Sequence, residues 1–348
     1  MTTVAASMDP SAVAGSMRLA RTLAAVAVVW LACTASGAAQ RAETVYGPWS
    51  SRVESQPCRR EYWVVNTRQA PACDDLENGF DRLTYSKYDD ARGWLRYRRE
   101  EFVAAMDASL PTTFFVHGSF LNHKWAVRCG WRYYHGVGNG VPAFRLVLWS
   151  WPAERIPHRN ALDNFRVKMA RSERQGYYLA ALINQLDPAV PLSLTGHSIG
   201  CRSVCAALEG LASGEVAGAP LPPPSFTGRR AIQAGLLVPA FDPRYLWPGG
   251  RYGDALSQVD RLLVVYNPRD RMMGVHSRRI SPWVLGRYGM PEPQRLGENQ
   301  YKLLQVSSQN WVGHAHRFSR YANSKNGTSW MRRYFFYQGA PPVGVSGH

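Results

Sequence analysis

The chain has 348 residues, enough for one large α/β domain or two small ones; 45% are hydrophobic and 19% charged. This globular composition, without heptads or low-complexity runs, excludes a fibrous or largely disordered protein. The net charge of +16 would suit nucleic-acid binding, but lysine supplies only five of the 41 basic residues, and the arginines are scattered. Because no basic run is interleaved with aromatics, we expect no nucleic-acid partner. Contact with a membrane or another anionic surface stays an alternative.

The N-terminal segment predicts an exported protein. A basic stretch at 17–21 precedes an apolar stretch at 23–33, and small residues follow at 34–39. This order is typical of a secretory signal peptide, and the apolar stretch is too short to cross a bilayer comfortably. We therefore assign residues 1–39 to a leader and expect a periplasmic, secreted or envelope-associated protein.

Cysteines in and after the leader raise two further expectations. Lipid attachment at Cys33 is a weaker alternative to simple export, because Trp30 stands where a lipoprotein signal usually holds an aliphatic residue. Residues 40–109 form an N-terminal extension that is polar, aromatic and basic, with few apolar residues to hold it together. Cys58 and Cys73 are therefore candidates for a disulfide within that extension.

Short apolar runs recur through the rest of the chain and alternate with helical patterns. We predict strands at 61–67, 111–120, 144–151, 190–195, 231–238, 261–266 and 301–306. We predict helices at 100–109, 161–186 and 201–211. This alternation predicts an α/β domain at 110–340, with a mostly parallel central sheet and helices on both faces. Ligands of such sheets bind at the carboxyl ends of the strands.

The segment Gly-His-Ser-Ile-Gly at 196–200 joins a predicted strand to a predicted helix. A Gly-x-Ser-x-Gly segment in this context is typical of a nucleophile elbow, where the serine sits on a strained turn and the glycines let strand and helix pass closely. We therefore predict Ser198 as a nucleophile. The amide of Ile199 would face a developing oxyanion, with a second amide donor at Ser119 or Phe120.

A serine nucleophile needs a histidine base and an acid that orients the base, and in this arrangement the acid precedes the histidine in the chain. Asp270 directly follows the strand at 261–266 and is the favoured acid. Asp242, at the end of the previous strand, is its rival.

Two histidines follow the last predicted strand, where the base is expected. We favour His314 over His316, because Gly313 gives the loop freedom to turn the His314 imidazole toward the serine. Two earlier histidines, His117 and His197, are expected to brace loops around the site.

Cys201 and Cys205 lie one helical turn apart in the helix after the elbow. No histidine or carboxylate stands at ligand spacing beside them, so we expect buried thiols that face the sheet and no metal site.

Together these segments resemble the α/β-hydrolase superfamily, and within it a bacterial group of uncharacterised α/β hydrolases. That group is typified by a His-Gly-Phe-Asn loop, a Trp-Pro strand end and a His-Ser-Met-Gly-Asn-Arg elbow. The counterparts here are His-Gly-Ser-Phe at 117–120, Trp-Pro at 151–152 and His-Ser-Ile-Gly-Cys-Arg at 197–202. The resemblance covers about residues 110–320. It implies a triad that needs no metal or organic cofactor, made of Ser198, Asp270 and His314.

These features predict an exported serine hydrolase that cleaves a carboxylic ester through an acyl-enzyme, with a small-molecule or lipid-like acyl ester as substrate. An amidase, peptidase or acyltransferase with the same triad is one alternative. A non-catalytic binding protein with the same fold is another. The aromatic loops at 241–247 and 283–288 are candidates to line an acyl or alcohol pocket.

Overall fold

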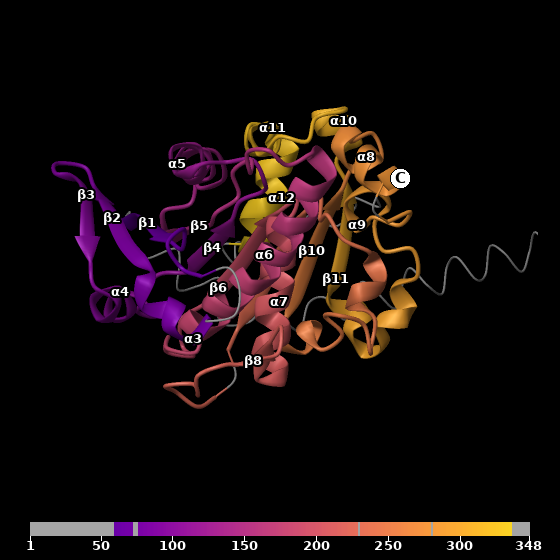
Figure 1. Ribbon diagram of the computed structural model, residues 1–348. Helices are drawn as coiled ribbons and strands as arrows, with labels where there is room; N and C mark the ends of the chain where they lie inside the picture. Colours follow the sequence, from indigo (N-terminus) through magenta and orange to yellow (C-terminus); the bar gives the residue numbers. More distant parts are fainter. Residues whose placement is uncertain (1–58, 72–75, 229, 280, 336–348) are drawn as a thin grey trace, which may run out of the picture. The chain divides into compact units, whose positions relative to one another are not determined.

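The structure, a computed structural model that describes residues 59–71, 76–228, 230–279 and 281–335, is built on a nine-stranded sheet (Figure 1). The strand order is β11-β10-β9-β6-β4-β5-β1-β2-β3, and the seven strands from β11 to β1 run parallel. The parallel strands are β1 Arg59–Asn66, β4 Thr112–Val116, β5 Ala143–Ser150, β6 Leu192–His197, β9 Ile232–Leu237, β10 Arg261–Tyr266 and β11 Leu303–Ser307. This order confirms the prediction of a mostly parallel α/β sheet, and the central strands are rich in apolar residues and buried along their whole length.

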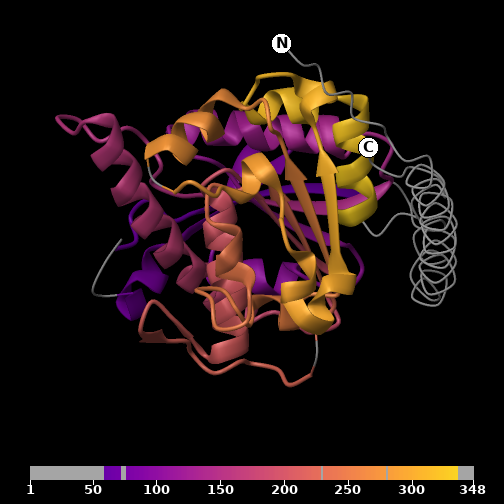
Figure 2. The same ribbon diagram turned by 90° about the vertical axis from the view of Figure 1, so that its right-hand side faces the viewer.

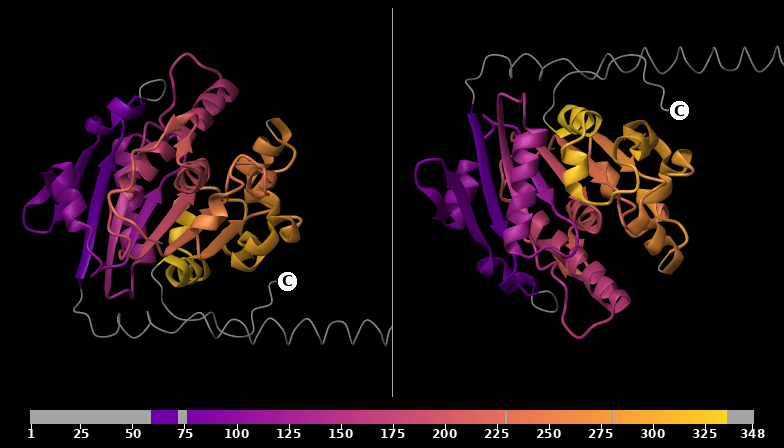
Figure 3. Two further views of the ribbon diagram at one scale, coloured as in Figure 1. Left: turned by 90° about the horizontal axis from the view of Figure 1, so that it is seen from below. Right: turned by 90° about the horizontal axis from the view of Figure 1, so that it is seen from above.

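Helices cover both faces of this sheet (Figures 2 and 3). On one face α7 packs against β4, β6 and β9, and α6 packs on α7. On the other face α12 packs against β6, β9 and β10, and α5 packs against β5. The α-helices are α3 Leu76–Gly79, α4 Arg99–Ala105, α5 His123–Arg132, α6 Ala161–Ile183, α7 Gly200–Ser213, α8 Arg271–Arg279, α9 Leu285–Tyr288, α10 Gln309–Val312, α11 Phe318–Ala322 and α12 Lys325–Phe335.

The chain reverses its direction across the sheet at β4. From β4 it moves outward to β5 and then returns past β4 to β6, so that β4 lies between the two strands that follow it in sequence. A crevice is expected outside the carboxyl ends of the strands at such a switch point, because the loops there lead to opposite faces. Helices α5, α8, α10 and α11 all lie at one end of the sheet (Figure 1).

Residues 59–97, which the sequence assigned to an N-terminal extension, contribute three strands to the same sheet. β1 pairs in parallel with β5, and an antiparallel hairpin of β2 Thr84–Asp89 and β3 Gly93–Tyr97 continues the sheet outward. Buried Glu61 ties β1 to β5 by accepting hydrogen bonds from Trp63 Nε1 and Arg145 Nε, each at 3.0 Å. Burial alone would raise the pKa of Glu61, but these donors and the charges of Arg145 and Lys87 lower it to about 2.

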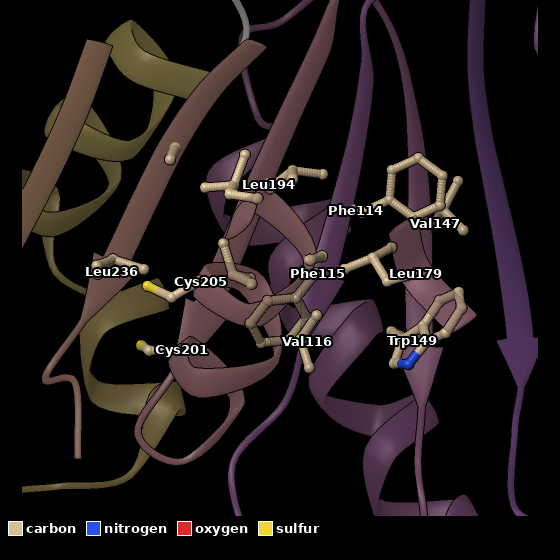
Figure 4. Packing of buried hydrophobic residues seen from close by; sticks show 14 of the residues in the cluster. Phe114, Phe115, Val116, Val147, Trp149, Leu179, Leu194, Cys201, Cys205 and Leu236 are labelled. Atoms are coloured by element: carbon tan, nitrogen blue, oxygen red, sulfur yellow. The ribbon is translucent and has the colours of Figure 1, made fainter. Parts of the chain in front are cut away.

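The two cysteines of α7 are part of the hydrophobic core. Figure 4 shows Cys201 and Cys205 on the side of α7 that faces the sheet, beside Leu236 of β9. Both thiols are fully buried and free, as expected from their spacing, and burial raises the pKa of each. They fill space between helix and sheet and have no nucleophilic character at neutral pH.

Several expectations concern residues outside the described ranges. The leader at 1–39, lipid attachment at Cys33 and the Cys58–Cys73 disulfide all fall there. Within the described ranges, no helix combines the length and the hydrophobicity needed to cross a membrane.

Candidate active site

The turn between β6 and α7 holds Ser198 in a strained backbone conformation. Its φ angle is +56°, in the left-handed region that residues other than glycine rarely adopt. A side chain at Gly196 would come within 2.5 Å of the Cys201 Cα atom, and one at Gly200 within 2.4 Å of the Val116 carbonyl oxygen. Glycine is therefore required on both sides of the serine for β6, α7 and β4 to approach this closely.

Ser198, His316 and Asp270 form a continuous hydrogen-bonded chain at the carboxyl end of the sheet. The Ser198 hydroxyl lies 3.0 Å from His316 Nε2, and His316 Nδ1 lies 2.7 Å from Asp270 Oδ2. The carboxylate can only accept, so Nδ1 carries the proton and Nε2 is free to accept from the serine. Asp270 is 1% exposed and Ser198 2% exposed, whereas His316 is partly exposed. The three residues have the geometry of a nucleophile, a base and an orienting acid.

The preference for His314 over His316 is not supported by this geometry. The His314 side chain is exposed, and its Nδ1 atom lies 2.9 Å from the Arg269 carbonyl oxygen, away from the serine. Asn267 adds a second link by donating from Nδ2 to the Gly313 carbonyl oxygen at 2.9 Å. These bonds tie the loop after β11 to the loop after β10, so the imidazole that reaches Ser198 comes two residues later, from His316.

Asp270 performs two tasks with its two carboxylate oxygens. Oδ2 contacts His316, while Oδ1 accepts from the amides of Met272 and Met273 at 2.8 and 3.0 Å. These are the first free amides of α8, so the carboxylate caps that helix and is held rigid beside the imidazole. The rival acid, Asp242, is paired with Arg244 and has no contact with either histidine after β11.

His197, the residue before the serine, forms a hydrogen bond with the backbone of His316. Its Nε2 atom lies 2.9 Å from the His316 carbonyl oxygen, which requires Nε2 to carry a proton. Burial, with the neighbouring His316, lowers the pKa of His197 to about 3, so it stays neutral. The sequence predicted that His197 braces a loop, but it did not indicate that its partner is the backbone of His316.

The candidate oxyanion amides named from the sequence differ in their hydrogen bonding. Phe120 donates its amide to the Ala153 carbonyl oxygen at 2.6 Å, so it is not available for this purpose. The amides of Ser119 and Ile199 make no hydrogen bond within the described part of the chain. A side chain at Gly118 would come within 3.3 Å of the Ser198 Cβ atom. The loop after β4 therefore lies directly against the serine, a position compatible with an oxyanion site.

A cavity of about 690 Å³ opens beside Ser198 and His316. Its walls are mainly aromatic and aliphatic. They are formed by residues of β4, of the loop after β4 at 117–121, and of α5, α6, α8 and α11. The apolar lining consists of Phe115, Phe120, Leu121, Trp125, Phe165, Met272, Met273 and Phe318. The aromatic loops at 241–247 and 283–288 do not line it; Phe241 is buried and packs against Tyr245 and Tyr252.

Lys168 on α6 lies behind this cavity and was not singled out from the sequence. Its side chain is fully buried, and its Nζ atom lies 3.6 Å from the centre of the Phe120 ring. It has no hydrogen-bond partner among the described residues. Burial and the neighbouring Arg171 lower the pKa of Lys168 to about 8. The buried Lys168 ammonium thus supports the ring of Phe120, which lies in the loop after β4.

No group of three or more histidine, cysteine or carboxylate side chains within the described ranges is arranged to hold a metal ion. The sequence matches no protein-family model, and a search among curated proteins finds no relative. The function is therefore inferred from the geometry of the site.

Proposed function

We propose that the protein is a serine hydrolase of the α/β-hydrolase type that cleaves a carboxylic ester, with Ser198 as nucleophile, His316 as base and Asp270 as the orienting acid. The observation that carries this proposal is the pair of hydrogen bonds of 3.0 and 2.7 Å that joins these residues, with the serine at a φ of +56°. A core or surface serine has no need of a strained backbone that aims it at a hydrogen-bonded histidine–aspartate pair.

In the first half-reaction, His316 Nε2 takes the hydroxyl proton while Ser198 Oγ attacks the ester carbonyl carbon. The amides of Ser119 and Ile199 stabilise the negative charge that develops on the carbonyl oxygen. Asp270 stabilises the imidazolium that forms. Collapse of the tetrahedral intermediate transfers the proton from His316 to the departing alcohol and leaves an acyl group on Ser198.

In the second half-reaction, His316 takes a proton from water, and the resulting hydroxide attacks the acyl-enzyme carbonyl. The proton then returns to Ser198 Oγ as the carboxylic acid leaves. The apolar walls of the cavity favour a substrate with an aliphatic or aromatic group next to the scissile bond, since burying such a group stabilises the complex by about 25 cal/mol per Å².

The test is labelling with a fluorophosphonate, which reacts only with an activated serine. We expect the wild type to be labelled and Ser198→Ala to remain unlabelled while keeping the wild-type circular dichroism spectrum. A folded wild type that is not labelled would exclude the hydrolase and favour a binding protein. A series of esters and anilides with matched acyl groups then separates an esterase from an amidase.

Export of the protein is a further proposal, supported by the signal-like sequence at 17–39. N-terminal sequencing of the protein recovered from a bacterial host tests it. Cleavage near residue 39 in the exported fraction supports export, and an intact N-terminus in the cytoplasmic fraction contradicts it.

A further inference from the structure

Among the described residues that line the cavity, the charged side chains are of one sign. No aspartate or glutamate is among them, whereas Arg132 and Arg317 are. The nearest carboxylate of the site, Asp270, is 1% exposed, and its two oxygens are occupied by His316 and by the start of α8. The walls therefore combine apolar side chains with two guanidinium groups and no side-chain carboxylate to neutralise them.

These two arginines differ from two less exposed arginines of the same domain. Arg68 pairs with Glu154, and Arg202 pairs with Glu173, so their charges are satisfied internally. Arg132 at the end of α5 and Arg317 at the start of α11 are exposed and form no ion pair within the described residues. Guanidinium groups at the wall of a partly enclosed apolar cavity attract and orient anions, because the low dielectric constant of the walls strengthens the field.

We propose that the substrate of this site carries an anionic group, a carboxylate or a phosphate, which Arg132 and Arg317 bind while the scissile ester lies at Ser198. This inference rests on the proposed hydrolase function and names its substrate class. The planar forks of two arginines suit the several oxygens of a carboxylate or phosphate. The apolar walls formed by Phe115, Phe165 and Phe318 then hold the carbon chain between the anion and the ester.

The test compares pairs of esters that differ only in charge. 4-Nitrophenyl hexanoate and the 4-nitrophenyl monoester of adipic acid share a six-carbon acyl chain, and only the second ends in a carboxylate. Phenyl hexanoate and 4-hexanoyloxybenzoate place the same difference on the alcohol side. A 4-nitrophenyl ester of 6-phosphonohexanoic acid distinguishes a preference for phosphate-like groups from one for carboxylates.

We expect kcat/KM to be at least tenfold higher for the charged member of one pair, and the ratio to shrink as ionic strength rises. The double variant Arg132→Gln/Arg317→Gln should bring that ratio close to one. Arg320→Gln is a matched control, because this exposed arginine lies on α11, which Arg317 precedes, but does not line the cavity. Equal rates for both members of both pairs, or a preference that survives in the double variant, would overturn the proposal.

Calorimetric titration of the uncleaved esters into Ser198→Ala separates this inference from the proposed function. Tighter binding of the charged ester, lost in the triple variant that also carries Arg132→Gln and Arg317→Gln, supports the anion site even if the wild type is not labelled by a fluorophosphonate. Labelling of the wild type together with equal affinities for charged and neutral esters supports the hydrolase and overturns the anion site.

Discussion

His197 Nε2 donates a hydrogen bond of 2.9 Å to the carbonyl oxygen of His316, so the residue before the proposed nucleophile holds the backbone of the proposed base. The elbow and the histidine loop are 119 residues apart in the sequence, and this bond fixes the distance between them. His197 lines the cavity, but its hydrogen bond goes to the His316 backbone, and we propose that it is a positioning residue that acts through His316.

Removing this donor should lower the reaction rate more than substrate binding. In His197→Ala we expect kcat to fall by about 10-fold to 100-fold with a much smaller change in KM, because a displaced imidazole loses its alignment with Ser198. His197→Gln, whose amide nitrogen can reach the same carbonyl, should recover most of the rate. Equal losses in the alanine and glutamine variants would contradict the positioning role.

Mild acid should destabilise the fold through its buried histidines. Burial lowers the pKa of His117 and His197 to about 3 and that of His276 to about 4. The unfolded chain takes up these protons below about pH 6.5 while the folded chain does not. The free energy of unfolding therefore falls as the pH drops from about 6.5, by about 1.4 kcal/mol per pH unit for each histidine.

Urea denaturation between pH 7.5 and 4.5 measures this slope. His197→Gln has no ionisable group at that position. The slope of its free energy of unfolding against pH should therefore be shallower by about 1.4 kcal/mol per pH unit. A free energy of unfolding that stays constant from pH 6.5 to 4.5 would show that these histidines are charged in the folded protein. Glu61, with its pKa lowered to about 2, adds a loss of the same sign only below about pH 4.5.

The buried charge of Lys168 should lower the free energy of unfolding at neutral pH. Its buried ammonium has no hydrogen-bond partner among the described residues, and its pKa is lowered to about 8. We expect Lys168→Met, which keeps the chain length and removes the charge, to raise the free energy of unfolding at pH 7 by roughly 1 kcal/mol or more.

The pH dependence of the stability gained in Lys168→Met tests whether the buried charge is its cause. The folded protein releases the Lys168 proton above about pH 8 and the unfolded chain only near pH 10.4, so the wild type gains stability across this interval. The advantage of Lys168→Met should therefore shrink as the pH rises from 7 to 10. An advantage that grows with pH would mean that the ammonium is stabilised in the fold.

The sequence was sufficient for the parts of the site that depend on local patterns. The central strands are buried and rich in apolar residues, and the glycines around Ser198 are needed for its turn, so both could be predicted from neighbouring residues. The position of Asp270 followed from its place just after β10. The cavity walls could not be predicted, because they come from segments that lie far apart in the sequence.

The choice between His314 and His316 depends on contacts between distant loops. Gly313, with a φ of +58°, does turn the chain as expected, but its carbonyl oxygen accepts from Asn267, and the next side chain bonds to Arg269. Nothing in the spacing of the histidines indicates these bonds.

The β2–β3 hairpin was missed for a different reason. It lies at the edge of the sheet and exposes many polar and charged side chains, so its residues lack the apolar pattern of the central strands.

The most direct measurement is the rate of fluorophosphonate labelling of His316→Ala and His314→Ala beside the wild type. We expect His316→Ala to slow labelling by about 10⁴-fold or more, since a triad without its base loses nearly all of its activity. His314→Ala should slow it by less than about tenfold, because only a link between loops is lost. Near-wild-type labelling of His316→Ala, with loss of labelling in a folded His314→Ala, would contradict the proposed triad.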